Sequence, residues 1–134
     1  MRQMSLDDFT TPPTSAYRED AGRLLRAMRL WVMLARSGRN PRSALNALLG
    51  QAAGRFSLLM EATVVAWPEP FVTFPPCASF ASPDEATLMA LLSYAEADAE
   101  LAAHRLLADM LPMADRLRLW QAAARVVAEH IGTG

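Results

Sequence analysis

Three side chains that could bind a metal or move a proton are spaced four residues apart. Glu96, Glu100 and His104 would share one face of a helix if that helix continued through Asp98. A carboxylate and an imidazole at this spacing can bind a metal ion. However, di-iron bundles use a Glu-x-x-His spacing of three on two helices, and this chain has no second copy. We therefore favour a solvated face with a Glu100–His104 ion pair. Glu100 and His104 are the only candidate metal ligands, and we predict no bound metal or cofactor.

The single cysteine, Cys77, is the candidate nucleophile. A catalytic thiolate needs a lowered pKa and an oriented base. Cys77 stands among prolines and aromatic residues, where burial would disfavour the charged thiolate, and no nucleophile motif surrounds it. We therefore predict no catalytic residue. A lone cysteine also excludes a disulfide within these 134 residues, and a reducing cytoplasm is the compartment that we expect.

Charge is unevenly distributed along the chain. Residues 18–55 carry eight arginines and two acids, a net charge of +6, whereas residues 56–134 carry four arginines and ten acids, a net charge of −6. The arginine-rich half could bind nucleic acid, but the whole chain has a net charge of −1 and no second basic element. The acidic half is an equally good partner for these guanidinium groups, within one subunit or between two. Nucleic-acid binding is therefore our third hypothesis.

The clearest secondary structure covers residues 82–131, which read as three consecutive helices. Ser82 and Glu85 form a capping box with Pro83 at the first helical position. We expect Asp98 to cap the second helix, which ends before Pro112. The third helix carries apolar residues at spacings of 4, 3, 4, 3 and 4, which predicts a seam along a partner helix. These residues are Met113, Leu117, Trp120, Ala124, Val127 and Ile131.

The first half predicts three more helices. The longest runs over about residues 16–37, with Ser15 as its cap and Gly38 as its stop. A short helix follows Asn40–Pro41 and ends near Gly50 or Gly54, and another covers about residues 55–66. Residues 67–81 contain four aromatic residues and several prolines, so we expect an extended connection that buries its aromatic side chains. The predicted domains are a flexible lead-in, residues 1–15, and one helical domain, residues 16–132.

The long first helix offers candidate interface residues. Its arginines, including Arg26 and Arg29, lie opposite the apolar face, and Leu30 and Leu34 fall on the arginine side although they are apolar. Neighbouring helices that pack on two sides would explain these leucines. The alternative is a subunit interface formed by Leu30 and Leu34 with Arg26 and Arg29.

The order of these features resembles a family of short bacterial proteins of unknown function. Pro76–Cys77, followed by Ser82-Pro83-Asp84-Glu85-Ala86 and a leucine-rich helix, carries the resemblance over roughly residues 18–131. Members carry an arginine-bearing first helix and a leucine-rich middle, and they tend to have more than one cysteine at the Pro-Cys position, where this chain has only Cys77. The resemblance implies no activity and no site residues.

The sequence thus predicts an all-α fold, an irregular bundle of five to six helices with one extended proline- and aromatic-rich connection. No stretch is long and apolar enough to cross a membrane. Our leading functional hypothesis is a non-catalytic, soluble protein that self-associates, first as a dimer, or docks a protein partner through helix faces. The alternative is a small-molecule-binding or enzymatic domain with a pocket near residues 67–81, reached by Cys77, His104 or Trp67.

Overall fold

The computed structural model describes residues 12–132, with side chains described up to residue 130. Within this range the chain is all-α, as predicted. The α-helices are α2 (Glu19–Arg36), α3 (Arg42–Leu49), α4 (Ala53–Ala66), α5 (Pro83–Glu96), α6 (Glu100–Leu107) and α7 (Met113–Gly132). Two short 3₁₀ turns, η1 (Thr14–Ala16) and η2 (Gly50–Ala52), precede α2 and α4. No helix in the described range has the length and apolar character needed to span a bilayer.

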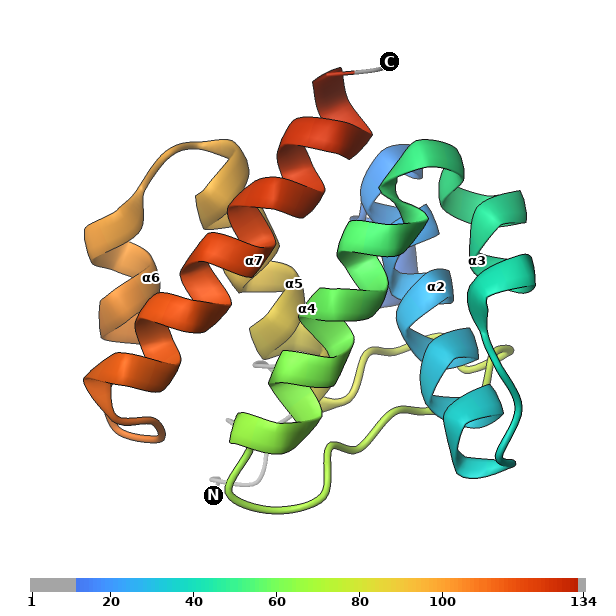
Figure 1. The fold of residues 1–134 in the computed structure, drawn as a ribbon, viewed down its shortest axis with the longest axis horizontal. Helices are drawn as coiled ribbons and strands as arrows, with labels where there is room; N and C mark the ends of the chain where they lie inside the picture. The colour runs from blue at the N-terminus through green and yellow to red at the C-terminus, as the bar shows by residue number, and fades with distance from the viewer. Residues whose placement is uncertain (1–11, 133–134) are drawn as a thin grey trace.

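Helix α7 is the central element of the bundle. It packs against both α4 and α5, and α6 packs against α5 and α7. Helix α2 contacts α3 and α5, so that α2 and α3 lie at the end of the molecule opposite α6 (Figure 1). The core between these helices is continuous and includes the fully buried Met28, Phe56, Leu88 and Leu119.

Two predicted helix ends are confirmed in atomic detail. The Ser82 hydroxyl accepts a hydrogen bond from the Glu85 amide at 3.0 Å, and the Glu85 carboxylate accepts one from the Ser82 amide at 2.8 Å. At the end of α2, Gly38 has a φ of 72°, a left-handed conformation that glycine adopts without strain. The amides of Gly38 and Arg39 donate to the last carbonyls of the helix, which completes a Schellman motif.

Asp98 does not cap a helix, so this prediction is wrong. It has a φ of 56° and ends α5 instead. Its amide donates to the Ala95 carbonyl at 3.2 Å, and the Ala99 amide donates to the Tyr94 carbonyl at 2.8 Å, which is again a Schellman pattern. Aspartate tolerates the left-handed region better than most residues. Helix α6 consequently begins without a side-chain cap.

The start of the helical domain also differs from the prediction. Ser15 lies within η1, and α2 begins at Glu19 without a side-chain cap. Residues 12–14 run antiparallel to residues 79–81, with an isolated bridge between Pro13 and Phe80 and amide-to-carbonyl hydrogen bonds of 2.7 and 3.0 Å. The last part of the predicted lead-in, residues 12–15, is therefore anchored to the connection. Residues 1–11 lie outside the described range.

The apolar seam of α7 is rotated relative to the predicted one. Trp120 and Val127 are buried as expected, but Met113 and Leu117 are exposed and Ala124 is half-buried. The predicted spacing assumes one partner helix, whereas α7 packs against both α4 and α5. The buried side therefore also includes Leu119, Ala123 and Val126. The Ile131 side chain lies outside the described set.

The connection between α4 and α5 is extended, as predicted. Trp67 and Phe71 are buried and meet edge to face, with ring centroids 5.0 Å apart. Phe74 is half-buried, whereas Phe80 is exposed, so the expectation that all the aromatic residues are buried is wrong for Phe80. The backbone of Phe80 is held in place, since it pairs with Pro13 and its carbonyl accepts a hydrogen bond from Arg29. In this position the side chain is exposed to solvent.

Candidate functional site

The Glu100–His104 pair predicted from the sequence forms within α6. The His104 Nε2 and Glu100 Oε2 atoms lie 3.4 Å apart, but only 16% of the His104 side chain is exposed, so this face is less solvated than predicted. Glu96 does not join the pair. It lies on α5, and this helix ends before Asp98, which has a left-handed backbone conformation. In the part of the chain that the structure describes, no three His, Cys, Asp or Glu side chains gather as a metal site would require.

Cys77, whose burial the sequence leaves open, is exposed. It follows Pro75 and Pro76 in a tight turn that the Ala78 amide closes on the Pro75 carbonyl at 2.9 Å. This turn holds Cys77 on the outside of the connection.

Two of the four candidate interface residues are buried within the subunit. Arg29 is 3% exposed and Leu34 is also buried, so the prediction of an exposed face containing both is wrong. Leu30 is half-buried, and only Arg26 is exposed. The interpretation that neighbours pack on two sides of the helix therefore explains Leu34.

Arg29 is buried because it forms an ion pair with the fully buried Glu85. Its Nε donates to Glu85 Oε2 at 2.9 Å, and its Nη2 donates to Glu85 Oε1 at 3.1 Å. This fork-to-fork geometry is the strongest that arginine and a carboxylate can adopt. The remaining donors reach three carbonyls of the connection, those of Pro76 at 3.4 Å, Ala78 at 3.1 Å and Phe80 at 3.0 Å.

Glu85 also receives two backbone hydrogen bonds, from the Ser82 amide at 2.8 Å and the Phe74 amide at 2.9 Å. All five N–H groups of Arg29 are thus used, and both oxygens of Glu85 accept two bonds. The group of Arg29, Glu85 and their backbone partners fixes the connection between α2 and α5. Because the hydrogen-bonding groups of both side chains are already used, the pair has none left for a ligand, and its role is structural.

Other arginines of the basic half are also used within the subunit. Arg23 pairs with Asp20 at 3.2 Å, and the Arg36 guanidinium donates to the Phe71 carbonyl at 2.9 Å. Arg18 pairs with Glu96 at 3.5 Å. Arg18 and Arg29 therefore join the basic half to the acidic half inside one subunit, and these internal pairs reduce the charge available for nucleic acid.

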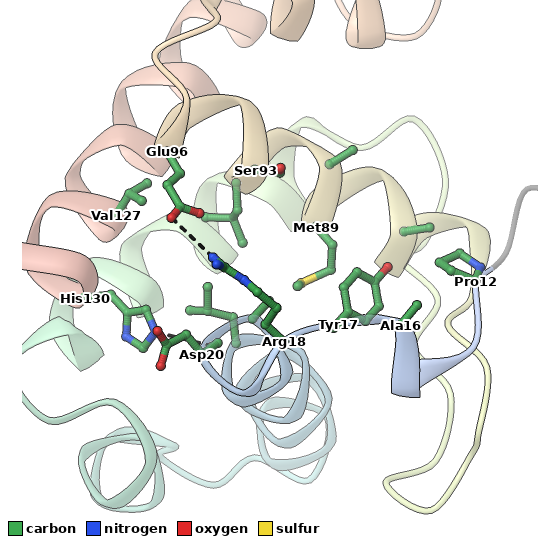
Figure 2. A pocket seen from close by; sticks show the side chains of 15 residues that line it. Pro12, Ala16, Tyr17, Arg18, Asp20, Met89, Ser93, Glu96, Val127 and His130 are labelled. Carbon is green, nitrogen blue, oxygen red and sulfur yellow. Dashed lines mark hydrogen bonds and ion pairs between the residues drawn. The ribbon is translucent and has the colours of Figure 1, made fainter. Parts of the chain in front are cut away.

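A cavity of about 470 Å³ lies between the start of α2 with the segment before it, the α5 residues from 86 to 96, and the end of α7. We call it the α2–α5–α7 pocket (Figure 2). Its apolar wall consists of Pro12, Ala16, Ala21, Leu24, Ala86, Met89, Ala90, Leu92 and Val127. Its polar groups belong to Tyr17, Arg18, Asp20, Ser93, Glu96 and His130.

The Arg18–Glu96 ion pair crosses this pocket. Figure 2 shows the Arg18 side chain extending from the start of α2 toward Glu96, with Tyr17 and Met89 on one side and Asp20 and His130 on the other. The pair is open to solvent, since the Arg18 and Glu96 side chains are 78% and 42% exposed. Such exposed pairs contribute roughly 0–1 kcal/mol to stability.

Tyr17 supplies a polar group that the described part of the fold does not use. Within residues 12–130 its hydroxyl makes no hydrogen bond. Burial raises the pKa of Tyr17, the Glu85 carboxylate raises it further, and Arg29 partly offsets both. The hydroxyl therefore stays protonated at neutral pH and can donate a hydrogen bond to a molecule in the pocket.

A smaller cavity lies where the sequence predicted one. It measures about 300 Å³ and lies against Pro70 and Phe71 of the connection. Neither Cys77, His104 nor Trp67 lines it, so the predicted route by which reactive side chains would reach a pocket is wrong. Its wall is largely apolar and its one charged residue is Arg36.

The larger pocket had only a faint signal in the sequence. Ala86, Ala90 and Ser93 follow one another at helical spacing on α5, and Ala21 faces the same space from α2. Small side chains on facing helices either allow close packing or leave a gap, and the sequence does not separate these outcomes. Comparison of the chain with models of protein families, with curated proteins and with solved structures gives no match.

Proposed function

We propose that this protein binds a small, largely apolar molecule in the α2–α5–α7 pocket. The observation that carries the proposal is the cavity itself, whose volume falls within the range of about 300–1,000 Å³ that is usual for ligand sites. Its apolar wall is built by three helices, and its few polar groups come from residues that include Arg18 and Glu96. This combination supplies apolar contact area together with a few polar groups that orient the ligand.

The burial of Arg29 and Leu34 also favours ligand binding over a subunit interface on α2. Both were candidates for a subunit interface, and both are used inside the bundle. The first helix therefore offers less surface to a partner than its sequence predicts. Because the wall of the pocket is largely apolar, we propose binding rather than catalysis.

Filling the pocket tests this proposal. Ala90 lies on its wall, so Ala90→Phe places a ring in the cavity, whereas Ala47→Phe adds the same ring at an exposed position on α3. We expect the neutral fluorescent probe N-phenylnaphthylamine to bind the wild type and Ala47→Phe saturably and to lose binding to Ala90→Phe. Circular dichroism melting checks that both variants fold. Equal binding by all three proteins, or no binding to the wild type, would overturn the proposal.

A second candidate function, self-association, is favoured by the surface of α4. Leu58 is 54% exposed and Val65, two turns further along, is 83% exposed. Because seven residues make two helical turns, both side chains project on one side of the helix. We propose that two copies pair through this side of α4 in an isologous dimer, in which each helix covers the other.

We also propose the cytoplasm as the compartment of the protein, because the chain has a single cysteine.

Sedimentation equilibrium tests this second proposal. We expect the wild type to dimerise at high concentration and Val65→Arg to be monomeric, since a desolvated arginine on the two-fold surface is costly. Leu101→Arg is the matched control, because Leu101 is exposed on α6. A wild-type protein that stays monomeric at high concentration, or equal association of both variants, would contradict the proposed dimer.

A further inference from the structure

We propose that the ligand of the α2–α5–α7 pocket is a monocarboxylic acid with an apolar tail, whose carboxylate replaces Glu96 as the partner of Arg18. This inference rests on the proposed function and specifies the class of ligand. It follows from which groups of the pocket are already engaged and which are not.

Arg18 has the most unengaged donors among the residues of the pocket, and Asp20 and Glu96 each use one carboxylate oxygen in an ion pair. The Arg18 guanidinium uses one nitrogen, Nη2, in its contact with Glu96, and the other donors of its fork make no hydrogen bond within residues 12–130. The Tyr17 hydroxyl, on the neighbouring residue, also makes none. The planar fork of this guanidinium matches the acceptor geometry of one carboxylate, whereas the Tyr17 hydroxyl points away from it (Figure 2).

The acidic residues of the pocket do not prevent this. Asp20 is paired with Arg23 at 3.2 Å, so its charge is partly compensated from outside the pocket. Glu96 holds Arg18 through a single contact of 3.5 Å, in which both side chains reach solvent. A ligand carboxylate that takes two bonds from the same guanidinium therefore competes well for it, and the displaced Glu96 becomes hydrated.

The residues that flank the Arg18 side chain determine the orientation of the ligand. Tyr17 and Met89 lie on one side of the Arg18 side chain (Figure 2). A carboxylate held by Arg18 leaves the tail to pack on Met89, Leu24 and the alanines of α5, which belong to the same cavity. Helix α2 also begins beside Arg18 without a side-chain cap, and the positive end of its dipole favours a negative head group there.

A set of three probes with the same tail tests the head group separately from the pocket. Isothermal titration calorimetry measures the Kd of decanoate, decanol and decylamine, each below its aggregation concentration. In the wild type we expect decanoate to bind about tenfold more tightly than decanol, because a charge-assisted fork adds to the same apolar contact. Decylamine, which lacks an acceptor for Arg18, binds least tightly.

Three variants assign the effect to residues. Arg18→Gln should weaken decanoate about tenfold and leave decanol within about twofold, since Arg18 contacts only the head group. Glu96→Gln should tighten decanoate, because it removes the competing carboxylate. Tyr17→Phe should change the affinities for decanoate and decanol by the same factor, because its hydroxyl lies apart from the Arg18 guanidinium (Figure 2). The loss of decanoate affinity in Arg18→Gln together with its gain in Glu96→Gln is a pattern that a merely structural ion pair would not produce.

The outcomes separate this inference from the proposed function. Equal affinity for all three probes, abolished by Ala90→Phe, keeps the pocket and overturns the carboxylic acid. A preference for decylamine that Glu96→Gln removes overturns it too, because the pocket would then select cations. Failure of every probe to bind removes the proposed function and the inference with it.

Discussion

Replacing Arg29 with methionine should destabilise the fold strongly without touching the pocket wall. The change removes five hydrogen bonds and leaves the Glu85 carboxylate with only the Ser82 and Phe74 amides. Glu85 is fully buried, so its charge is left without a cation. Breaking such a pair from one side costs about 3–5 kcal/mol. We expect the lower end, about 3 kcal/mol, because the amides remain and water can reach the partly buried carbonyls.

Urea denaturation followed by circular dichroism measures this loss. With a slope of about 2 kcal/mol per molar urea, a loss of about 3 kcal/mol lowers the midpoint by about 1.5 M. Arg26→Met is the matched control, since Arg26 is exposed on the same helix, and it should change stability by no more than about 0.5 kcal/mol. Arg29→Lys keeps the charge but cannot form the fork, so its midpoint should fall between those of the wild type and Arg29→Met.

The reasoning would be refuted if Arg29→Met and Arg26→Met had similar midpoints. It would also fail if Arg29→Lys matched the wild type, because the geometry of the fork would then contribute nothing.

Three further predictions concern backbone conformation, titration and the buried side of α7. Gly38→Ala should cost about 1 kcal/mol because φ is 72° there, whereas Gly22→Ala, in the body of α2, should stabilise the protein by a few tenths to about 1 kcal/mol in thermal melts. The pKa of Tyr17 is raised in the folded state, so its contribution to the free energy of unfolding is fully present below the pKa of the unfolded state and is lost as pH rises through the pKa of the folded state. The urea midpoint should therefore fall less between about pH 9 and pH 11 in Tyr17→Phe than in the wild type. Leu119→Ala should cost about 2–5 kcal/mol and Leu117→Ala less than about 1 kcal/mol, and equal costs in urea titrations would contradict the rotated seam.

Local chemistry made some elements predictable from the sequence. The capping box of Ser82 and Glu85 and the left-handed stop at Gly38 depend on residues within a few positions of one another, and both form as predicted. The sequence predicts the wrong role for Asp98, because aspartate favours both helix caps and left-handed stops, and the choice depends on how α5 and α6 pack.

Contacts between residues far apart in the chain could not be predicted from the sequence. Arg29 has the periodicity of a solvent-facing residue, and its burial depends on Glu85, 56 residues away, and on three carbonyls of the connection. The α7 seam shifted because its position depends on two partner helices. The α2–α5–α7 pocket is likewise a property of three helices, since small residues such as Ala86 and Ala90 leave a cavity only when α2 does not close on them.

The most direct test of the α2–α5–α7 pocket is the methyl spectrum of the protein labelled with ¹³C-methyl methionine and titrated with decanol. Met89 lies on the wall of the pocket, whereas Met33 and Met113 are exposed elsewhere and serve as internal references. Binding in the pocket predicts a saturable shift of the Met89 resonance, no shift of Met33 or Met113, and no response in Ala90→Phe. A Met89 resonance that does not move, or one that moves equally in Ala90→Phe, would contradict it.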